Sequence, residues 1–177
     1  LAEVIDYARG RFRINVELKY NVPDPQLAAA VVALLREKQF LDQVVITSLD
    51  HASLRQVEKL LPSLDTGLIV TAAVGNVLKT DTDFVSLNSA RATASLVDQA
   101  RAAGKKVHVW TVNKPEVMLR MIERDVDNII TDDPARLVRV MRDRNGLTPQ
   151  EQVGVRLRVL FTESPPELED ASSVPML

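Results

Sequence analysis

The sequence predicts an α/β protein in which short β-strands alternate with helices along most of the chain. Strand-like segments of about five to seven residues, rich in Val, Ile and Thr, precede segments of about ten to thirteen residues with helical spacing of apolar side chains. This rhythm is typical of parallel β/α units, which build either an open doubly wound sheet or a (β/α)8 barrel. No G-x-G-x-x-G or G-x-x-x-x-G-K-[ST] motif follows a strand, which disfavours the nucleotide-binding α/β folds.

The first half of the chain opens with a predicted helix over residues 2–8, which ends near Gly10, a residue suited to a left-handed cap. A strand follows over residues 13–20, and two prolines in the segment NVPDP stop its continuation. The next predicted elements are a helix over 26–38, a strand over 43–49, a helix over 52–61 and a strand over 66–72.

The second half continues the same alternation up to Gly146. We expect a strand over 83–88, a helix over 91–103 closed by Gly104, a strand over 106–112, a helix over 115–124 with proline in its first turn, a strand over 126–131 and a helix over 134–144. Beyond Gly146, residues 147–161 could form a helix or a strand, and residues 162–177, rich in Pro, Ser and acidic residues, indicate a mobile tail. We therefore divide the chain into residues 1–146 and an extension, residues 147–177.

Composition excludes several classes of protein. With 46% hydrophobic and 26% charged residues, the 177-residue chain is globular, and its net charge of −2 gives no electrostatic case for binding nucleic acid. The absence of cysteine excludes disulfides and Cys-based zinc sites. No apolar run reaches the ~20 residues of a membrane helix, so we expect a soluble segment. The chain begins with Leu1 rather than Met, within a helical pattern, and we expect it to be part of a longer protein.

Polar residues occupy one face of the first predicted strand. Ile14, Val16 and Leu18 point to one side, and Asn15, Glu17 and Lys19 to the other, because side chains alternate along a strand. On a sheet exposed on one side this polar face would be wet, whereas inside a barrel its charges would need partners or a function. A carboxylate beside an ammonium is compatible with a metal ligand and an anion-binding group, and equally with a structural ion pair.

Further polar residues follow the other strands, at the edge where barrel enzymes carry their chemistry: Ser48, Asp50, Asn88, Trp110, Asn113, Thr131 and Asp132. Trp110, the one tryptophan, could be a flat wall beside a ligand or a core aromatic. We favour a structural role for His108 and an exposed position for His51. With two histidines and no serine–base pair, the sequence offers no catalytic triad.

Several segments, in order, resemble the glycerophosphodiester phosphodiesterase family. NVELK is similar to the family's N-[IV]-E-[IL]-K strand, and VVITSLD to its V-[IL]-[IV]-S-S-F-D strand. VHVWTVNKPEVM resembles V-x-x-W-T-V-N-x-x-x-x-M, and VDNIITDDPARL resembles V-D-G-I-I-T-D-x-P-x-x-L, with Asn128 in place of glycine. The resemblance covers residues 1–142 and implies part of a (β/α)8 TIM barrel of the phospholipase-C-like phosphodiesterase type, without its amino-terminal strands.

The resemblance also implies a function and site residues. The family hydrolyses glycerophosphodiesters to glycerol 3-phosphate and an alcohol with a divalent metal, Ca²⁺ or Mg²⁺. By resemblance, Glu17 is a metal ligand, Lys19 contacts the phosphate and Trp110 lines the substrate pocket. The family's H-R-G, E-x-D and H-D motifs, which supply the other carboxylates and the catalytic histidines, have no counterpart in this sequence. We therefore expect an incomplete metal site, no catalytic acid–base residue in this chain, and little or no hydrolysis by the chain alone.

Two other expectations concern partners. A partial barrel leaves sheet edges unpaired, which favours association between copies of the chain. The alternative function is a non-catalytic, barrel-derived module of a larger protein that binds a ligand or a partner, with a membrane domain upstream as some family members have.

Overall fold

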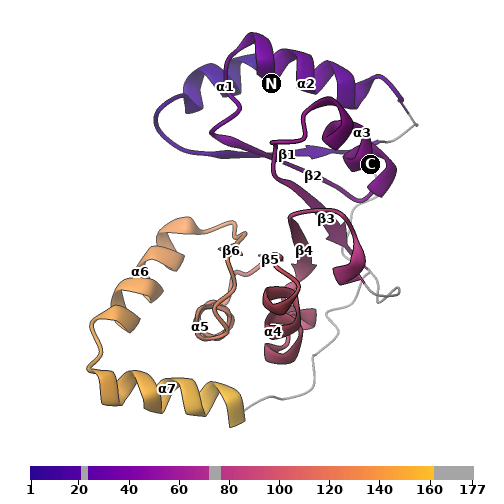
Figure 1. Ribbon diagram of the computed structural model, residues 1–177. Coiled ribbons are helices and arrows are strands. Elements are labelled where there is room, and N and C mark those ends of the chain that lie inside the picture. The colour runs from indigo at the N-terminus through magenta and orange to yellow at the C-terminus, as the bar shows by residue number, and fades with distance from the viewer. Residues whose placement is uncertain (21–23, 72–76, 162–177) are drawn as a thin grey trace. The chain divides into compact units, whose positions relative to one another are not determined.

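The computed structural model describes residues 1–20, 24–71 and 77–161 (Figure 1). The predicted mobile tail therefore lies outside the described residues. The strands are β1 (Ile14–Leu18), β2 (Val44–Ser48), β3 (Thr66–Val70), β4 (Phe84–Asn88), β5 (Lys106–Trp110) and β6 (Asn128–Ile129). The α-helices are α1 (Ala2–Ala8), α2 (Leu27–Glu37), α3 (His51–Leu60), α4 (Ala94–Ala102), α5 (Pro115–Glu123), α6 (Pro134–Asn145) and α7 (Pro149–Phe161). Short 3-10 helices occupy Val77–Lys79 and Ser89–Arg91.

The strands follow one another in the sheet in chain order, from β1 to β6. β1 pairs with β2, β2 with β3 and β5 with β6, in each case in parallel. The α/β class and the strand–helix alternation predicted from the sequence are confirmed. The chain divides into two compact units, one of Leu1–Ser86 with Ala100–Lys106 and the other of Leu87–Gln99 with Val107–Leu177.

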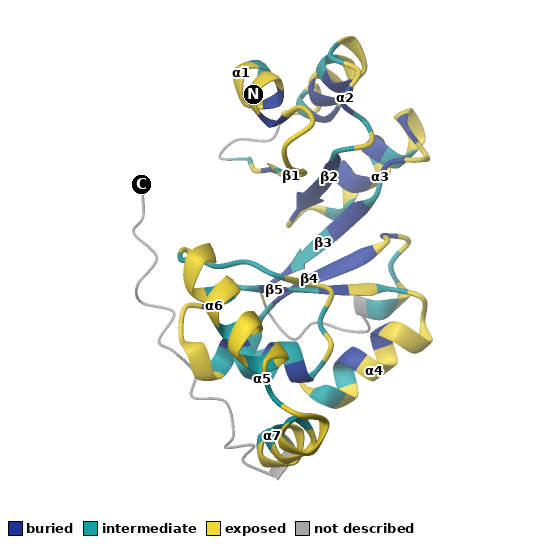
Figure 2. Ribbon diagram, turned by 90° about the vertical axis from the view of Figure 1, so that its left-hand side faces the viewer, coloured by how far each residue is buried: buried dark blue, intermediate teal, exposed yellow. Residues whose placement is uncertain are grey.

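The core of the first unit lies between β1 and β2 and the helices α1, α2 and α3. α2 buries a stripe at helical spacing, and the whole cluster comprises Ile5, Ala8, Leu18, Ala28, Val31, Val32, Leu35, Phe40, Val44, Ile46, Leu54, Val57, Leu61 and Leu64. Figure 2 shows the corresponding dark blue faces. Gly10 has φ of 69° after α1, as its expected cap role requires.

In the second unit, Val107 and Val109 of β5 and Met118 and Met121 of α5 are all buried. Its helices α6 and α7 are mostly exposed (Figure 2). The carboxylate of Glu123 is only 1% exposed and accepts a hydrogen bond from Nε of Arg144 at 2.9 Å, which joins the ends of α5 and α6. This bond raises the pKa of Arg144, so the guanidinium stays charged beside the buried carboxylate.

Two elements differ from the sequence-based expectation, and the choice left open between helix and strand for residues 147–161 is decided. The helix predicted over 91–103 starts later, because Asn88 caps a separate 3-10 helix and the hydroxyl of Thr93 accepts from the N–H of Leu96. β6 has two residues rather than six. Residues 149–161 form a helix, whose start is fixed by a capping box in which the N–H and hydroxyl of Thr148 donate to Glu151 at 2.8 and 2.7 Å.

Among the described glycines, Gly67 in β3 has the least room for a side chain. A Cβ at this position would lie 2.0 Å from the ring of Phe84, which is itself 1% exposed and cannot move without repacking. Overpacking of this kind usually costs about 1–3 kcal/mol or more.

We predict that Gly67→Ala lowers the free energy of unfolding by about 3 kcal/mol, measured by urea denaturation. The matched control is Gly154→Ala in α7, where a Cβ meets no atom within 4 Å. Because Ala is the better helix former, this control should gain about 0.5–1 kcal/mol. Equal effects of the two substitutions would contradict the packing argument.

Candidate functional site

The polar face of β1 is exposed in the described chain. Asn15, Glu17 and Lys19 are all exposed, while Ile14 and Val16 are half-buried and Leu18 is buried. No ion pair or hydrogen bond within the described residues engages the side chain of Glu17 or Lys19. A buried Glu–Lys pair, one of the two structural interpretations of this strand, is therefore wrong. The strand instead presents a carboxylate and an ammonium to solvent.

β2 fixes this polar face from the neighbouring position in the sheet. Thr47, opposite Glu17 in the parallel register, is 1% exposed and donates from its hydroxyl to Oδ1 of Asn15 at 2.9 Å. The buried hydroxyl of Ser48 donates to the carbonyl oxygen of Leu18 at 2.8 Å and accepts from the N–H of Asp50. The carboxyl ends of β1 and β2 are thus locked together, which limits where Glu17 can move.

Asp50 and His51 form the start of α3. Asp50 is the N-cap, and its carboxylate accepts hydrogen bonds from the N–H groups of Ala52 and Ser53 at 3.1 Å and from the Ser53 hydroxyl. The Ser53 hydroxyl and these amides lower the pKa of Asp50 below its usual value. Nδ1 of His51 lies 3.2 Å from the guanidinium of Arg55. His51 is half-buried rather than exposed as the sequence suggested.

Trp110 ends β5 in the second unit and is half-buried. Its indole Nε1 is buried and has no hydrogen-bond partner within the part of the chain that the structure describes. An indole N–H can only donate, and burying it unpaired costs about 1–3 kcal/mol. An apolar ring with a free N–H donor is compatible with the expected role of Trp110 in lining the substrate pocket, which stays a prediction.

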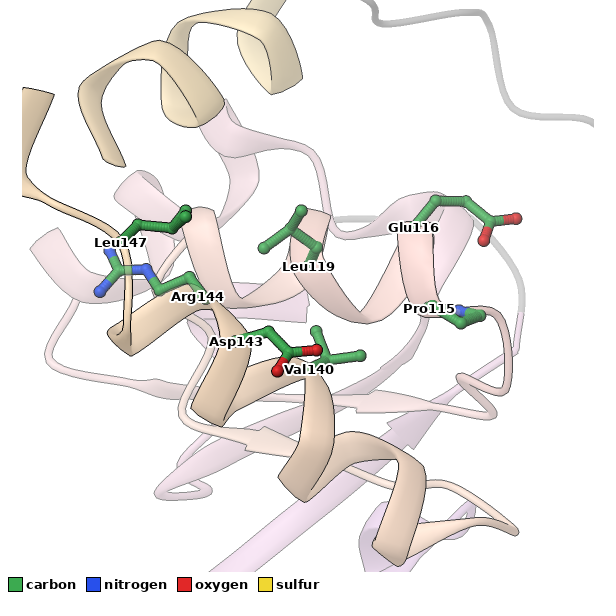
Figure 3. A pocket seen from close by; sticks show the side chains of 7 residues that line it. All are labelled: Pro115, Glu116, Leu119, Val140, Asp143, Arg144 and Leu147. Atoms are coloured by element: carbon green, nitrogen blue, oxygen red, sulfur yellow. The ribbon is translucent and has the colours of Figure 1, made fainter. Parts of the chain in front are cut away.

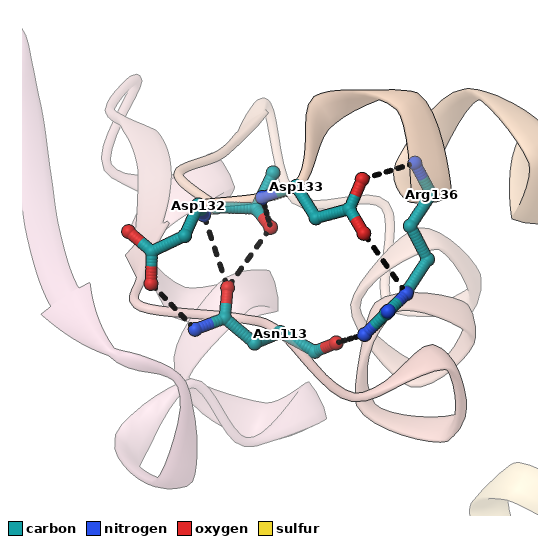
Figure 4. A network of polar contacts seen from close by, with 5 residues as sticks. Asn113, Asp132, Asp133 and Arg136 are labelled. Carbon is teal, nitrogen blue, oxygen red and sulfur yellow. Dashed lines mark hydrogen bonds and ion pairs between the residues drawn. The ribbon is translucent and has the colours of Figure 1, made fainter.

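A polar network joins the segments that follow β5 and β6 (Figure 4). Nδ2 of Asn113 donates to Oδ2 of Asp132 at 2.7 Å, and Oδ1 of Asn113 accepts from the N–H of Asp132 at 3.0 Å and from the hydroxyl of Thr131 at 3.1 Å. Asp133 caps α6 and pairs with Arg136, which also donates to the carbonyl oxygen of Asn113. We call the three bonds made by the Asn113 side chain the Asn113 latch.

A pocket lies elsewhere in the second unit, between α5 and α6 (Figure 3). Its volume is about 300 Å³, and its lining residues are Pro115, Glu116, Leu119, Val140, Asp143, Arg144 and Leu147. None of the site residues expected from the sequence lines it, so it gives no support to the predicted site.

The residues that the structure describes do not make a metal site by themselves. Within residues 1–20, 24–71 and 77–161 no group of three or more His, Asp or Glu side chains could hold a metal ion. A hard divalent cation needs several oxygen ligands, and Glu17 is a single carboxylate.

No helix among the described residues has the length and apolar character required to cross a bilayer.

Comparison with known proteins identifies relatives for most of the chain. A model of the glycerophosphoryl diester phosphodiesterase family matches residues 1–136. A glycerophosphodiester phosphodiesterase of Caldanaerobacter subterraneus is 32% identical over 136 residues, which cover 74% of this chain and 56% of that protein. A second, from Bacillus altitudinis, is 27% identical over 81% of this chain and 62% of the relative. The chain thus spans somewhat more than half the length of these relatives.

Solved structures agree. A glycerophosphoryl diester phosphodiesterase from Silicibacter pomeroyi superposes with a TM-score of 0.74 at 27% identity. The match covers 82% of this chain and 56% of that structure. An Oleispira antarctica phosphodiesterase, solved with the product sn-glycerol-3-phosphate, superposes with a TM-score of 0.65 at 22% identity. The match covers 73% of this chain and 55% of that structure, and it shows the shared fold. The predicted fold class, part of a (β/α)8 barrel, is confirmed.

We predict that Asp50→Ala lowers the free energy of unfolding by about 1 kcal/mol at pH 7, because α3 loses its cap. The folded-state pKa of Asp50 is depressed, so its stabilisation is present above the ordinary carboxyl pKa and is lost as pH falls through the folded value. The difference in the free energy of unfolding between wild type and Asp50→Ala should therefore become smaller in acid.

The control is Asp50→Ser, which keeps a capping oxygen but does not titrate. The difference in stability between Asp50→Ser and Asp50→Ala, measured by thermal unfolding, should stay constant with pH. A wild-type advantage that grows as pH falls would contradict the assignment.

Proposed function

Because this chain belongs to the glycerophosphoryl diester phosphodiesterase family, we propose that it is the carboxy-terminal part of a metal-dependent enzyme that hydrolyses glycerophosphodiesters to glycerol 3-phosphate and an alcohol. The ordered match over residues 1–136 carries this proposal. Support also comes from β1, where Glu17 and Lys19 are exposed on one strand face beside a fixed Asn15–Thr47 pair.

In the proposed enzyme, Glu17 is one metal ligand and Lys19 contacts the phosphate. A divalent metal would supply charge neutralisation at the phosphoryl group. Lys19 would add a point charge on a flexible stem, able to follow the phosphate oxygens as negative charge develops on them. Trp110 would line the substrate pocket with its apolar ring and offer Nε1 as a donor.

The alternative is a non-catalytic module that binds a phosphorylated ligand or a partner chain. The incomplete set of metal ligands in the described residues favours it, since one carboxylate does not hold a metal. The full reading frame separates the two functions: H-R-G, E-x-D and H-D motifs upstream of Leu1 support the enzyme, and a reading frame without them supports the module.

We predict no hydrolysis of glycerophosphocholine above background by this 177-residue chain with Mg²⁺ or Ca²⁺. In the full reading frame, Glu17→Gln should lower kcat/KM by about 100-fold or more, because a metal ligand is lost. The control, Glu37→Gln, changes an exposed carboxylate at the end of α2 and should have no effect. Metal-dependent turnover by the chain alone would disprove the incomplete-site hypothesis.

We further propose that the isolated chain self-associates through its outer elements. β1 and β6 end the strand order, and α1 exposes apolar side chains next to β1, among them Val4 at 51% and Tyr7 at 63%. Edge strands and apolar patches of this kind promote association.

Light scattering of the chain should show oligomers, and Val4→Lys with Tyr7→Lys should shift them towards monomer. Glu3→Lys, which makes the same net charge change as the double variant on the same helix, is the control and should leave the distribution unchanged. A monodisperse wild-type monomer would refute self-association.

A further inference from the structure

The segment around Trp110 is held on both sides by bonds to the strand that follows it in the sheet. The N–H of Ile130 donates to the carbonyl oxygen of Val109 at 2.8 Å, and the N–H of Val112 donates to the carbonyl oxygen of Ile130 at 2.9 Å. These two backbone bonds flank Trp110 and extend the parallel ladder past the end of β5. The main chain at Trp110 is therefore tied to the segment containing Ile130.

The Asn113 latch adds side-chain bonds immediately beyond this ladder. Only one orientation of the amide fits, because a carboxylate cannot donate: the NH₂ group must face Asp132, and the amide oxygen must face the N–H of Asp132 and the hydroxyl of Thr131. The bond to the carboxylate is charge-assisted and short, at 2.7 Å. One side chain thus connects the two segments that follow β5 and β6.

We propose that Asn113 is a positioning residue, which acts through the latch to hold Trp110 in the geometry that receives the glycerol phosphate part of the substrate. This inference rests on the proposed function. The Nε1 of Trp110 is buried and has no partner among the described residues, so it is available to donate to a ligand oxygen. Such a bond requires the indole to be held at a fixed angle and depth, which the latch provides.

The test uses Trp110 as its own reporter, since it is the one tryptophan of the chain. Asn113→Asp places a second carboxylate against Asp132, so the latch opens. Asp132→Asn keeps an oxygen for Nδ2 of Asn113, so the latch survives. N113D/D132N restores one donor and one acceptor with their roles exchanged. Asn113→Ala removes all three bonds without adding charge.

The expected result is a pattern across the variants. Quenching of Trp110 by acrylamide, a neutral quencher, should rise about twofold in N113D, where the bond to the Asp132 carboxylate is replaced by repulsion, and in N113A, where all three bonds are lost. D132N and N113D/D132N should match wild type, and circular dichroism should show equal helix content throughout. Equal quenching in all variants, or a double variant as accessible as N113D, overturns the proposal.

Titration with sn-glycerol 3-phosphate separates this inference from the proposed function. Trp110 emission should respond in wild type, D132N and the double variant, and N113D should need about tenfold more ligand for the same response. If the Trp110 emission of the wild-type chain does not change with sn-glycerol 3-phosphate, the pocket role of Trp110 in this chain is contradicted. The quenching series then still decides whether Asn113 holds the indole.

Discussion

Parallel pairing of neighbouring strands is the constraint on which the rest of this structure depends. When strands run in parallel, their carboxyl ends share one edge of the sheet, and the residues that follow them come together whatever their distance in sequence. In the first unit this register brings Ser48 to the carbonyl oxygen of Leu18. In the second it brings Asn113 to Asp132. Both units thus place bonded polar groups just past their strands, where β/α enzymes carry their chemistry.

The exposed carboxylate of Glu17 shows how family membership and a partial fold combine. The chain contains the strand that matches the family's N-[IV]-E-[IL]-K pattern, and β2 holds that strand firmly through Thr47 and Ser48. Yet the described residues gather no set of carboxylates and imidazoles around Glu17. A divalent cation needs several oxygens at once, so a well-placed ligand is not yet a site.

Local signals in the sequence were sufficient for most elements and insufficient for some. Gly10 and Gly104, both with positive φ, and Pro115 at the start of α5 mark helix boundaries that follow from the chemistry of single residues. The sequence left residues 147–161 open between helix and strand, because the segment VRLRVLF alternates, and the structure forms α7 with a capping box from Thr148 to Glu151. β6 came out shorter than its apolar pattern suggested, because Ile130 still bonds to Val109 but accepts from Val112 rather than Thr111, which breaks the regular ladder after Ile129.

The sequence by itself determined the order of strands and helices, the two faces of β1 and the family, because these depend on side-chain periodicity and on motifs contained within short segments. Tertiary structure alone decided the Asn113–Asp132 bond, the buried Glu123–Arg144 pair and the contact of Gly67 with Phe84. Each of these joins residues from different elements. Their meeting depends on strand register and helix packing, which distribute over the whole core and leave no local mark in the sequence.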